Sequence, residues 1–197
     1  DTAVRDGNWE SRNTLQGSEL FGKNLLLVGF GRIGREVGKR ALAFGMQLHV
    51  YDPYVDEQQV GAAGAVYVKD LDTFLPKTDF LSLHLPYTPK NHHIIGHKEL
   101  RALPSSAYVI NTARGGLIDE NELFKALESG NLAGAGLDCF EQEPPSKNLK
   151  LLNSEKVIVS PHNASLTAEC TRRLGLVCVE NVVDALSGCL KKERVVN

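Results

Sequence analysis

The chain has 197 residues, of which 42% are hydrophobic and 23% are charged, and its formal net charge at pH 7 is -2. This composition is that of an average globular protein, so it excludes a disordered chain and a fibrous repeat. The slightly acidic balance argues against a nucleic-acid-binding surface, because phosphate recognition needs a basic face.

Residues 1–23 lie before the regular pattern of strands and helices, and we predict that they form a lead-in or arm. Trp9 is the only tryptophan of the chain, and its sequence context is equally compatible with an interface contact and with core packing. No stretch reaches the roughly 18 apolar residues of a membrane span, and the polar start lacks the apolar core of a signal peptide. We therefore expect a cytoplasmic protein.

From residue 24 onward, short apolar runs alternate with helical patterns. This alternation is typical of parallel strands joined by crossover helices, and runs that are apolar nearly throughout indicate a sheet covered on both faces. We predict a Rossmann-type, doubly wound parallel α/β sheet in three layers, with residues 24–197 forming one domain. The expected strands are 24–29, 47–51, 80–85, 108–112, 134–138 and 156–160.

Helical spacing of apolar residues predicts three crossover or terminal helices. The first carries Ile33, Val37, Ala41 and Phe44 and ends at Gly45. The second begins with Asp119 and Glu122, a pair spaced like a capping box, and ends at Gly130. The third spans about 167–186, and its expected buried stripe is Leu174, Val177, Val182 and Leu186.

The glycine motif Gly29-Phe-Gly31-Arg-Ile-Gly34 follows a predicted strand and opens a predicted helix. Gly29 permits a tight turn, Gly31 lets the backbone approach a pyrophosphate, and Gly34 lets helix and strand pack closely. The positive end of the helix dipole attracts the phosphate charge. The motif therefore predicts a dinucleotide-binding turn rather than an incidental one.

Asp52 lies at the end of the second predicted strand, where an acidic residue accepts hydrogen bonds from the adenosine ribose hydroxyls. Its carboxylate would repel a 2′-phosphate, and no arginine directly follows it, so NAD is favoured over NADP. A turn aspartate before Pro53 is the alternative interpretation.

Three side chains at the ends of later strands suit hydride transfer to or from a 2-hydroxy acid, which needs a cation for the carboxylate and an acid–base group for the hydroxyl proton. Arg114 offers a bidentate guanidinium. His162 offers the acid–base group, and Glu143 could hold the imidazolium and raise its pKa. Taken singly, the three could be a surface charge, a helix-capping residue and a solvated loop acid.

Five segments together resemble the D-isomer-specific 2-hydroxyacid dehydrogenases, and within that family the D-3-phosphoglycerate dehydrogenase branch. The segments, which occur in family order, are Val28-Gly-Phe-Gly-Arg-Ile-Gly-Arg-Glu-Val, His84-Leu-Pro, Asn111-Thr-Ala-Arg-Gly-Gly, Gly136-Leu-Asp-Cys-Phe-Glu-Gln-Glu-Pro and Ser160-Pro-His. The resemblance implies an oxidoreductase that transfers hydride between NAD and a D-2-hydroxy acid, D-3-phosphoglycerate first among them. It also implies a homodimer, while the charge balance and the lack of a long apolar stretch argue against nucleic-acid and membrane partners.

The resemblance further assigns a role to each candidate residue. Arg114 would orient the substrate, His162 would act as general acid–base, and Glu143 would be the carboxylate partner of the histidine. The expected cofactor contacts are Arg32 and Ile33 at the pyrophosphate, Leu85 and Pro86 at the adenine and ribose, Thr112, Ala113 and Ala164 at the nicotinamide, and Asp138 at its carboxamide. Asn163 and Cys139 replace an aliphatic residue and a valine that are common in relatives, which weakens the branch assignment.

Two rival functions remain open. The C-terminal-binding-protein corepressors keep the fold and a similar Arg, Glu and His set, and they use NAD to promote assembly and protein recognition. Within the enzyme class, glyoxylate or hydroxypyruvate reductase is the nearest alternative, because the specificity loops are expected in the N-terminal segment. Family members also carry a substrate domain built mainly from an N-terminal segment of roughly a hundred residues, and this chain starts where that segment ends. We therefore expect the chain alone to bind NAD and to turn over slowly.

Histidines and cysteines do not predict a metal centre. His92, His93 and His97 are close in sequence, but Gly96 interrupts them, so an exposed loop and helix entry is favoured over a metal site. The four cysteines lack a CxxC pair and framework spacing, which favours reduced thiols over disulfides or zinc ligands.

Overall fold

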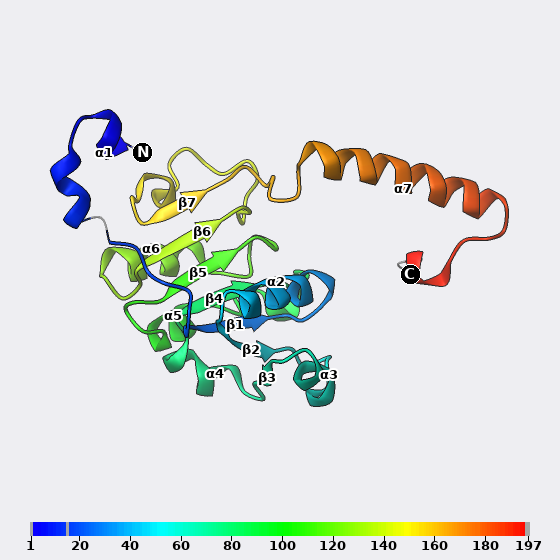
Figure 1. Ribbon diagram of the computed structural model, residues 1–197, viewed down its shortest axis with the longest axis horizontal. Helices are drawn as coiled ribbons and strands as arrows, with labels where there is room; N and C mark the ends of the chain where they lie inside the picture. Colours follow the sequence, from blue (N-terminus) through cyan, green and yellow to red (C-terminus); the bar gives the residue numbers. More distant parts are fainter. Residues whose placement is uncertain (1, 15, 196–197) are drawn as a thin grey trace. The chain divides into compact units, whose positions relative to one another are not determined.

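The computed structural model describes residues 2–14 and 16–195, and the chain divides into two compact units, Asp1–Val159 and Ser160–Asn197. The predicted segments 1–23 and 24–197 include positions 1, 15, 196 and 197, which lie outside the described residues. The first unit contains the sheet, and the second contains the helix α7 (Ala168–Leu186) and the 3-10 helix η5 (Lys192–Arg194) (Figure 1). No helix of the described residues is long and apolar enough to cross a membrane.

The first unit is built on a seven-stranded sheet with the order β3-β2-β1-β4-β5-β6-β7, and every pairing in it is parallel. The strands are β1 (Asn24–Val28), β2 (Gln47–Tyr51), β3 (Val66–Tyr67), β4 (Phe80–Leu83), β5 (Tyr108–Asn111), β6 (Gly134–Leu137) and β7 (Val157–Val159). The strand order reverses between β1 and β4, which is the switch point where open α/β sheets bind ligands. The predicted Rossmann-type fold is confirmed.

Helices cover both faces of the sheet. Successive residues of β1 point to opposite sides, so they show what packs on each face. Leu25 and Leu27 belong to a core cluster with residues of α2 and α3, whereas Leu26 and Val28 belong to a second core with residues of α4, α5 and α6. The α-helices of the first unit are α1 (Thr2–Arg5), α2 (Arg32–Ala43), α3 (Glu57–Ala62), α4 (Leu71–Phe74), α5 (His97–Ala102) and α6 (Glu120–Glu128). Its 3-10 helices are η1 (Trp9–Asn13), η2 (Leu75–Lys77), η3 (Pro89–Asn91) and η4 (Lys150–Asn153).

The first predicted helix is α2, but its buried face differs from the apolar spacing in the sequence. Ile33 and Phe44 are 68% and 63% exposed, and the buried residues are Gly34, Gly38 and Ala41. A Cβ at Gly38 would lie 2.7 Å from a methyl carbon of Leu48, so the helix lies too close to the sheet for a larger side chain. The contact face is therefore set by small residues, which apolar periodicity does not detect.

The second predicted helix is α6, and its start is only partly a capping box. The Asp119 carboxylate accepts hydrogen bonds from the backbone N–H groups of Asn121 and Glu122, as predicted. The Glu122 side chain instead contacts His97 and Lys125. Asp119 therefore caps the helix, while Glu122 contacts a histidine and a lysine on its surface.

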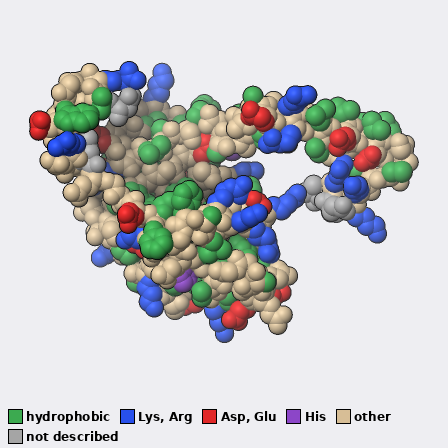
Figure 2. Space-filling model, in the orientation of Figure 1, with side chains coloured by type: hydrophobic (Ala, Val, Ile, Leu, Met, Phe, Trp, Pro, Cys, Tyr) green, Lys and Arg blue, Asp and Glu red, His purple; other side chains and the backbone are tan. Residues whose placement is uncertain are grey.

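The third predicted helix is α7 of the second unit, where the Thr167 hydroxyl caps the start by accepting from the Cys170 N–H. The prediction that Leu174, Val177, Val182 and Leu186 are buried is wrong, since all four are exposed and α7 has no buried residue. Hydrophobic side chains stand on its surface in Figure 2. The apolar stretch 174–179 runs around the helix, and no part of the described chain buries it.

The structure decides one open alternative and adds one strand. Trp9 lies on η1 and is 61% exposed, so it is not a core residue. The edge strand β3 was not predicted, because two residues at a sheet edge are too short for an alternating pattern.

Candidate functional site

In the first unit, the predicted site residues follow the carboxyl ends of parallel strands, and these ends lie at one edge of the sheet. Gly29 follows β1, Asp52 follows β2, Leu85 comes after β4, Arg114 comes after β5, and Asp138 follows β6. Side chains from segments far apart in the sequence therefore meet at the edge where such folds bind ligands.

The glycine turn at the end of β1 combines two close contacts with one open position. Gly29 has φ 100°, and a Cβ on it would lie 2.6 Å from the His84 carbonyl oxygen. A Cβ on Gly34 would lie 2.4 Å from the Gly29 carbonyl oxygen, whereas one on Gly31 would meet no protein atom within 4 Å. Packing explains the first two glycines, and Gly31 leaves the N-terminus of α2 open, which fits an approaching pyrophosphate.

Asp52 connects the glycine turn to the second strand. One carboxylate oxygen accepts from the Phe30 N–H at 2.7 Å, and the other accepts from the Tyr54 N–H at 2.9 Å. The bond from Tyr54 closes a local turn, as expected for a turn aspartate before Pro53. The bond from Phe30 joins Asp52 to the glycine turn after β1. A half-buried carboxylate thus stands beside the turn.

The residues expected at the rest of the dinucleotide are accessible. Arg32 and Ile33 are exposed on the first turn of α2, Leu85 is half-buried after β4, and Pro86 is exposed. The exposure of Ile33, which breaks the core pattern of α2, places an apolar side chain where a ligand can reach it.

His84 is a residue that sequence reasoning quoted in a motif but gave no role. Its ring Nε2 is 2.9 Å from the Ser82 hydroxyl, and burial lowers its pKa to about 4. A neutral imidazole therefore lies behind the glycine turn at neutral pH.

Asn111 fixes the loop that presents Arg114. Its buried side chain donates to the Arg114 carbonyl oxygen at 2.8 Å and accepts from the Ala113 N–H at 3.0 Å. The Arg114 side chain is exposed and donates to the Ala113 carbonyl oxygen, and Thr112 is also exposed. A polar residue at the end of a buried strand, before a short turn, was the sequence signal for this role.

The segment after β6 carries Asp138, Cys139 and Glu143. Asp138 and Cys139 are buried, and burial raises the pKa of the Cys139 thiol to about 12. Glu143 is exposed, and its Oε1 accepts from the Phe140 N–H at 3.0 Å. This bond closes a short turn and orients the carboxylate.

His162 and Ala164 belong to the second unit. His162 has φ 51°, in the left-handed region that non-glycine residues rarely adopt. The N-cap of α7 is Thr167, so the interpretation of His162 as the helix cap is wrong.

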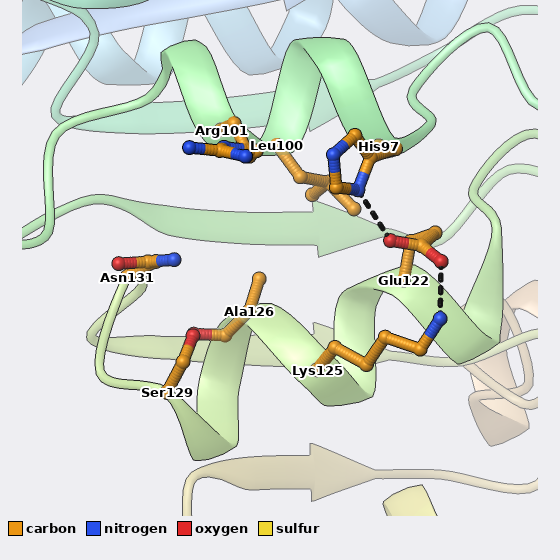
Figure 3. Close-up of a pocket in the computed structure, with 8 residues that line it drawn as sticks. All are labelled: His97, Leu100, Arg101, Glu122, Lys125, Ala126, Ser129 and Asn131. Carbon is orange, nitrogen blue, oxygen red and sulfur yellow. Dashed lines mark hydrogen bonds and ion pairs between the residues drawn. The ribbon is translucent and has the colours of Figure 1, made fainter.

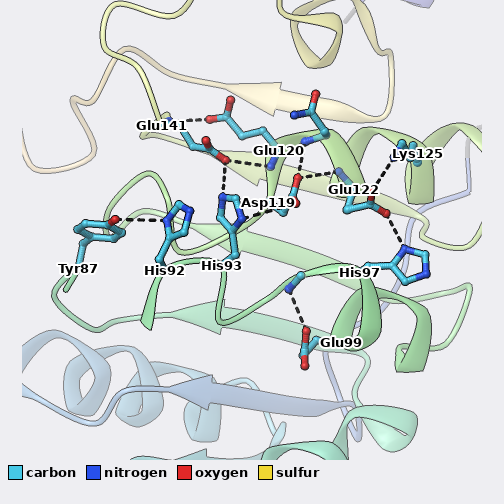
Figure 4. Close-up of polar contacts among 12 residues, drawn as sticks. Tyr87, His92, His93, His97, Glu99, Asp119, Glu120, Glu122, Lys125 and Glu141 are labelled. Carbon is cyan, nitrogen blue, oxygen red and sulfur yellow. Dashed lines mark hydrogen bonds and ion pairs between the residues drawn. The ribbon is translucent and has the colours of Figure 1, made fainter. Parts of the chain in front are cut away.

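Sequence reasoning also missed a polar network at the sheet edge, drawn in Figure 4. His93 Nε2 donates to Glu141 Oε1 at 2.9 Å, and His92 Nδ1 lies 3.3 Å from the Tyr87 hydroxyl. His97 Nδ1 contacts Glu122 at 2.6 Å. Within the described ranges, no group of three or more His, Cys, Asp or Glu side chains is arranged to hold a metal ion.

A shallow pocket of about 190 Å³ lies between α5 and α6, and its lining includes none of the predicted catalytic residues (Figure 3). Its lining is His97, Leu100, Arg101, Glu122, Lys125, Ala126, Ser129 and Asn131. Glu122 contacts both His97 and Lys125, so the lining combines one carboxylate with basic side chains.

Residues 1–164 match the family model "D-isomer specific 2-hydroxyacid dehydrogenase, NAD binding domain". The chain is 42% identical over 195 residues to D-3-phosphoglycerate dehydrogenase of Methanocaldococcus jannaschii, which covers 99% of this chain and 37% of the relative. It is 44% identical over 186 residues to hydroxypyruvate reductase of Thermotoga maritima, covering 93% of this chain and 59% of the relative.

Among solved structures, the fold is similar to D-lactate dehydrogenase from Aquifex aeolicus in complex with NAD and lactic acid. The TM-score is 0.84 at 32% identity, and the match covers 95% of this chain and 60% of that one. The chain therefore spans between about a third and three fifths of the length of these relatives.

Proposed function

This chain belongs to the D-isomer-specific 2-hydroxyacid dehydrogenase family, whose NAD-binding domain it matches, and we propose that it is the NAD-binding domain of an enzyme that oxidises D-3-phosphoglycerate. The observation that carries the proposal is the single sheet edge shared by the glycine turn, Asp52, Arg114 and Asp138. Such an edge can hold a dinucleotide with its reactive ring beside a cation for the substrate carboxylate.

The cofactor would be held by residues that follow the strand ends. The N–H groups at the start of α2, with Arg32 and Ile33, would bind the pyrophosphate, and Asp52 would accept from the ribose hydroxyls. Leu85 and Pro86 would line the adenine and ribose. Thr112, Ala113 and Ala164 would contact the nicotinamide, and Asp138 its carboxamide. The nicotinamide accepts or supplies the hydride.

Arg114 would bind the substrate carboxylate through its guanidinium and polarise the adjacent C–O group. His162 would take the hydroxyl proton during oxidation and return it to the carbonyl oxygen during reduction. Glu143 would be the carboxylate partner of this histidine. The guanidinium and the imidazole thus suit a substrate that carries a carboxylate next to a hydroxyl or a carbonyl.

We also propose that residues 24–197 form the NAD-binding domain and residues 1–23 a lead-in arm that contributes to a homodimer in the cytoplasm. The exposed Trp9 supports a contact role for this arm, since large amphipathic aromatic residues are enriched at interfaces.

The test measures NADH formed from NAD⁺ with D-3-phosphoglycerate, D-glycerate and glycolate in separate assays of the purified chain. The proposal expects slow turnover with the highest kcat/KM for D-3-phosphoglycerate. Absence of hydride transfer with all three acids would refute the dehydrogenase function.

A glyoxylate or hydroxypyruvate reductase is the second candidate, favoured by the 44% identity to a hydroxypyruvate reductase. Its expected signature is a higher kcat/KM for D-glycerate or glycolate than for D-3-phosphoglycerate. The same assays, repeated with NADH and the corresponding 2-oxo acids, separate the two candidates.

A further inference from the structure

His93 contacts both segments that carry the proposed catalytic residues of the first unit. Its backbone N–H donates to the Gly116 carbonyl oxygen at 2.7 Å, next to the Arg114 turn. Its ring Nε2 donates to Glu141 Oε1 at 2.9 Å, two residues before Glu143. Its ring Nδ1 lies 3.6 Å from Asp119 Oδ2. One side chain therefore connects the loop before α5, the loop after β6 and the start of α6 (Figure 4).

The backbone of His93 is held in an unusual conformation. Its φ is 52°, in the left-handed region where residues with a Cβ are uncommon. Such conformations persist where the surrounding contacts determine them, and they concentrate at functional sites. The hydrogen bonds on both sides of the residue supply those contacts.

The two catalytic segments that His93 connects lie in direct contact. A Cβ on Gly115 would lie 1.8 Å from the Phe140 carbonyl oxygen, so no side chain fits between them. The Phe140 N–H in turn donates to Glu143 Oε1 at 3.0 Å. A displacement of the segment Phe140–Glu141 is thus transmitted to Arg114 on one side and to Glu143 on the other.

We propose that His93 is a positioning residue for the dehydrogenase reaction, a proposal that rests on the proposed function. By binding Glu141 it holds the Arg114 turn and the Phe140–Glu143 segment against each other. His97 makes a similar pair with Glu122 between α5 and α6, but that pair contacts neither catalytic segment. His97 therefore provides a matched control for loss of a histidine–carboxylate pair.

The experiment measures single-turnover oxidation of NADH by hydroxypyruvate or 3-phosphohydroxypyruvate, with the purified chain in excess so that slow transfer is detected. His93→Leu is expected to slow hydride transfer between about 10- and 100-fold, because small displacements of catalytic groups cost this much. His93→Gln, which can still donate to Glu141, is expected to restore the rate to within about threefold. His97→Leu should match the unmodified chain, and all variants should keep its NADH dissociation constant.

Equal rates for His93→Leu and His97→Leu would overturn the inference, and so would a His93→Gln variant as slow as His93→Leu. If His93→Leu does not bind NADH because it misfolds, Glu141→Ala removes the acceptor from the other segment and should slow transfer similarly. An unchanged rate in Glu141→Ala would also overturn the inference. No hydride transfer by the unmodified chain would refute the proposed function itself, and this outcome differs from an active chain that is insensitive to His93.

Discussion

Glu120 and Glu141 each bind the backbone amide of the other. The Glu141 N–H donates to Glu120 Oε1 at 2.7 Å, and the Glu120 N–H donates to Glu141 Oε1 at 3.3 Å. The first residue of α6 and the segment after β6 are thereby joined by two carboxylates. The arrangement satisfies an N–H group at the helix start, which has no partner within the helix.

Two replacements of Glu120 should separate the effect of its charge on stability from the effect of its hydrogen bond. Burial raises the pKa of the Glu120 carboxyl, and the bond from the Glu141 N–H partly offsets this. A raised carboxyl pKa favours folding at low pH and loses that contribution as pH rises through the folded pKa. At neutral pH, Glu120→Gln should therefore be at least as stable as the unmodified chain, whereas Glu120→Ala should lose about 1 kcal/mol with the acceptor.

Urea unfolding at neutral pH and near pH 4.5 measures both Glu120 variants. A Glu120→Gln variant that is as unstable as Glu120→Ala at neutral pH would contradict this interpretation of the carboxylate.

The neutral imidazole of His84 should make the fold sensitive to acid. Its pKa in the folded chain is about 4, against an unfolded value of about 6.5. The unfolded chain takes up the proton first, so the contribution of His84 is complete above about pH 6.5 and falls as pH drops toward 4, by about 3 kcal/mol at most. Burial also lowers the pKa of His49, which adds a change of the same sign.

His84→Gln removes the titrating ring from this site. Unfolding free energies at about pH 7.5 and about pH 4.5 should differ less for this variant than for the unmodified chain. Identical pH dependence of the two proteins would exclude His84 as a source of acid sensitivity.

Asp52 should determine the choice between the two nicotinamide dinucleotides. Asp52→Arg is expected to weaken NADH binding by about 10-fold or more and to improve NADPH binding, because a repelling carboxylate is replaced by a phosphate-binding cation. Fluorescence titration with both dinucleotides measures the change. Asp52→Asn, which can still accept from the Phe30 N–H, tests the contribution of charge alone. Tighter binding of NADPH than of NADH by the unmodified chain would contradict the assignment.

The four thiols should differ in reactivity. Cys139 is buried, and its pKa of about 12 leaves almost no thiolate at neutral pH, whereas Cys178 and Cys189 are exposed. An aromatic disulfide reagent should modify Cys178 and Cys189 rapidly, and Cys139 only after unfolding. Cys139→Val provides the control, since it should leave the rapid phase unchanged and remove one thiol from the unfolded count.

The sheet could be predicted from the sequence because its strands are short apolar runs separated by glycines and helical patterns. The helix starts at Asp119 and Thr167 were predictable because a side-chain oxygen there accepts from the first turn. Which residues of α2 and α7 are buried could not be predicted, since periodicity identifies an apolar face but not the element that covers it.

Within the candidate site, the glycine turn and Asp52 were predictable because one local motif and its spacing define them. The bond between His93 and Glu141 joins residues 48 positions apart, and no local pattern indicates such a pairing. The left-handed backbone of His93 was equally hidden, because only a small fraction of histidines adopt this conformation.

The close backbone contact between Gly115 and Phe140 also limits how this site can be redesigned. Two loops that touch backbone to backbone cannot be lengthened or exchanged one at a time without a collision. A library intended to alter specificity should therefore vary the two loops, residues 112–117 and 139–145, together, and retain Arg114, Glu143 and the glycine at position 115.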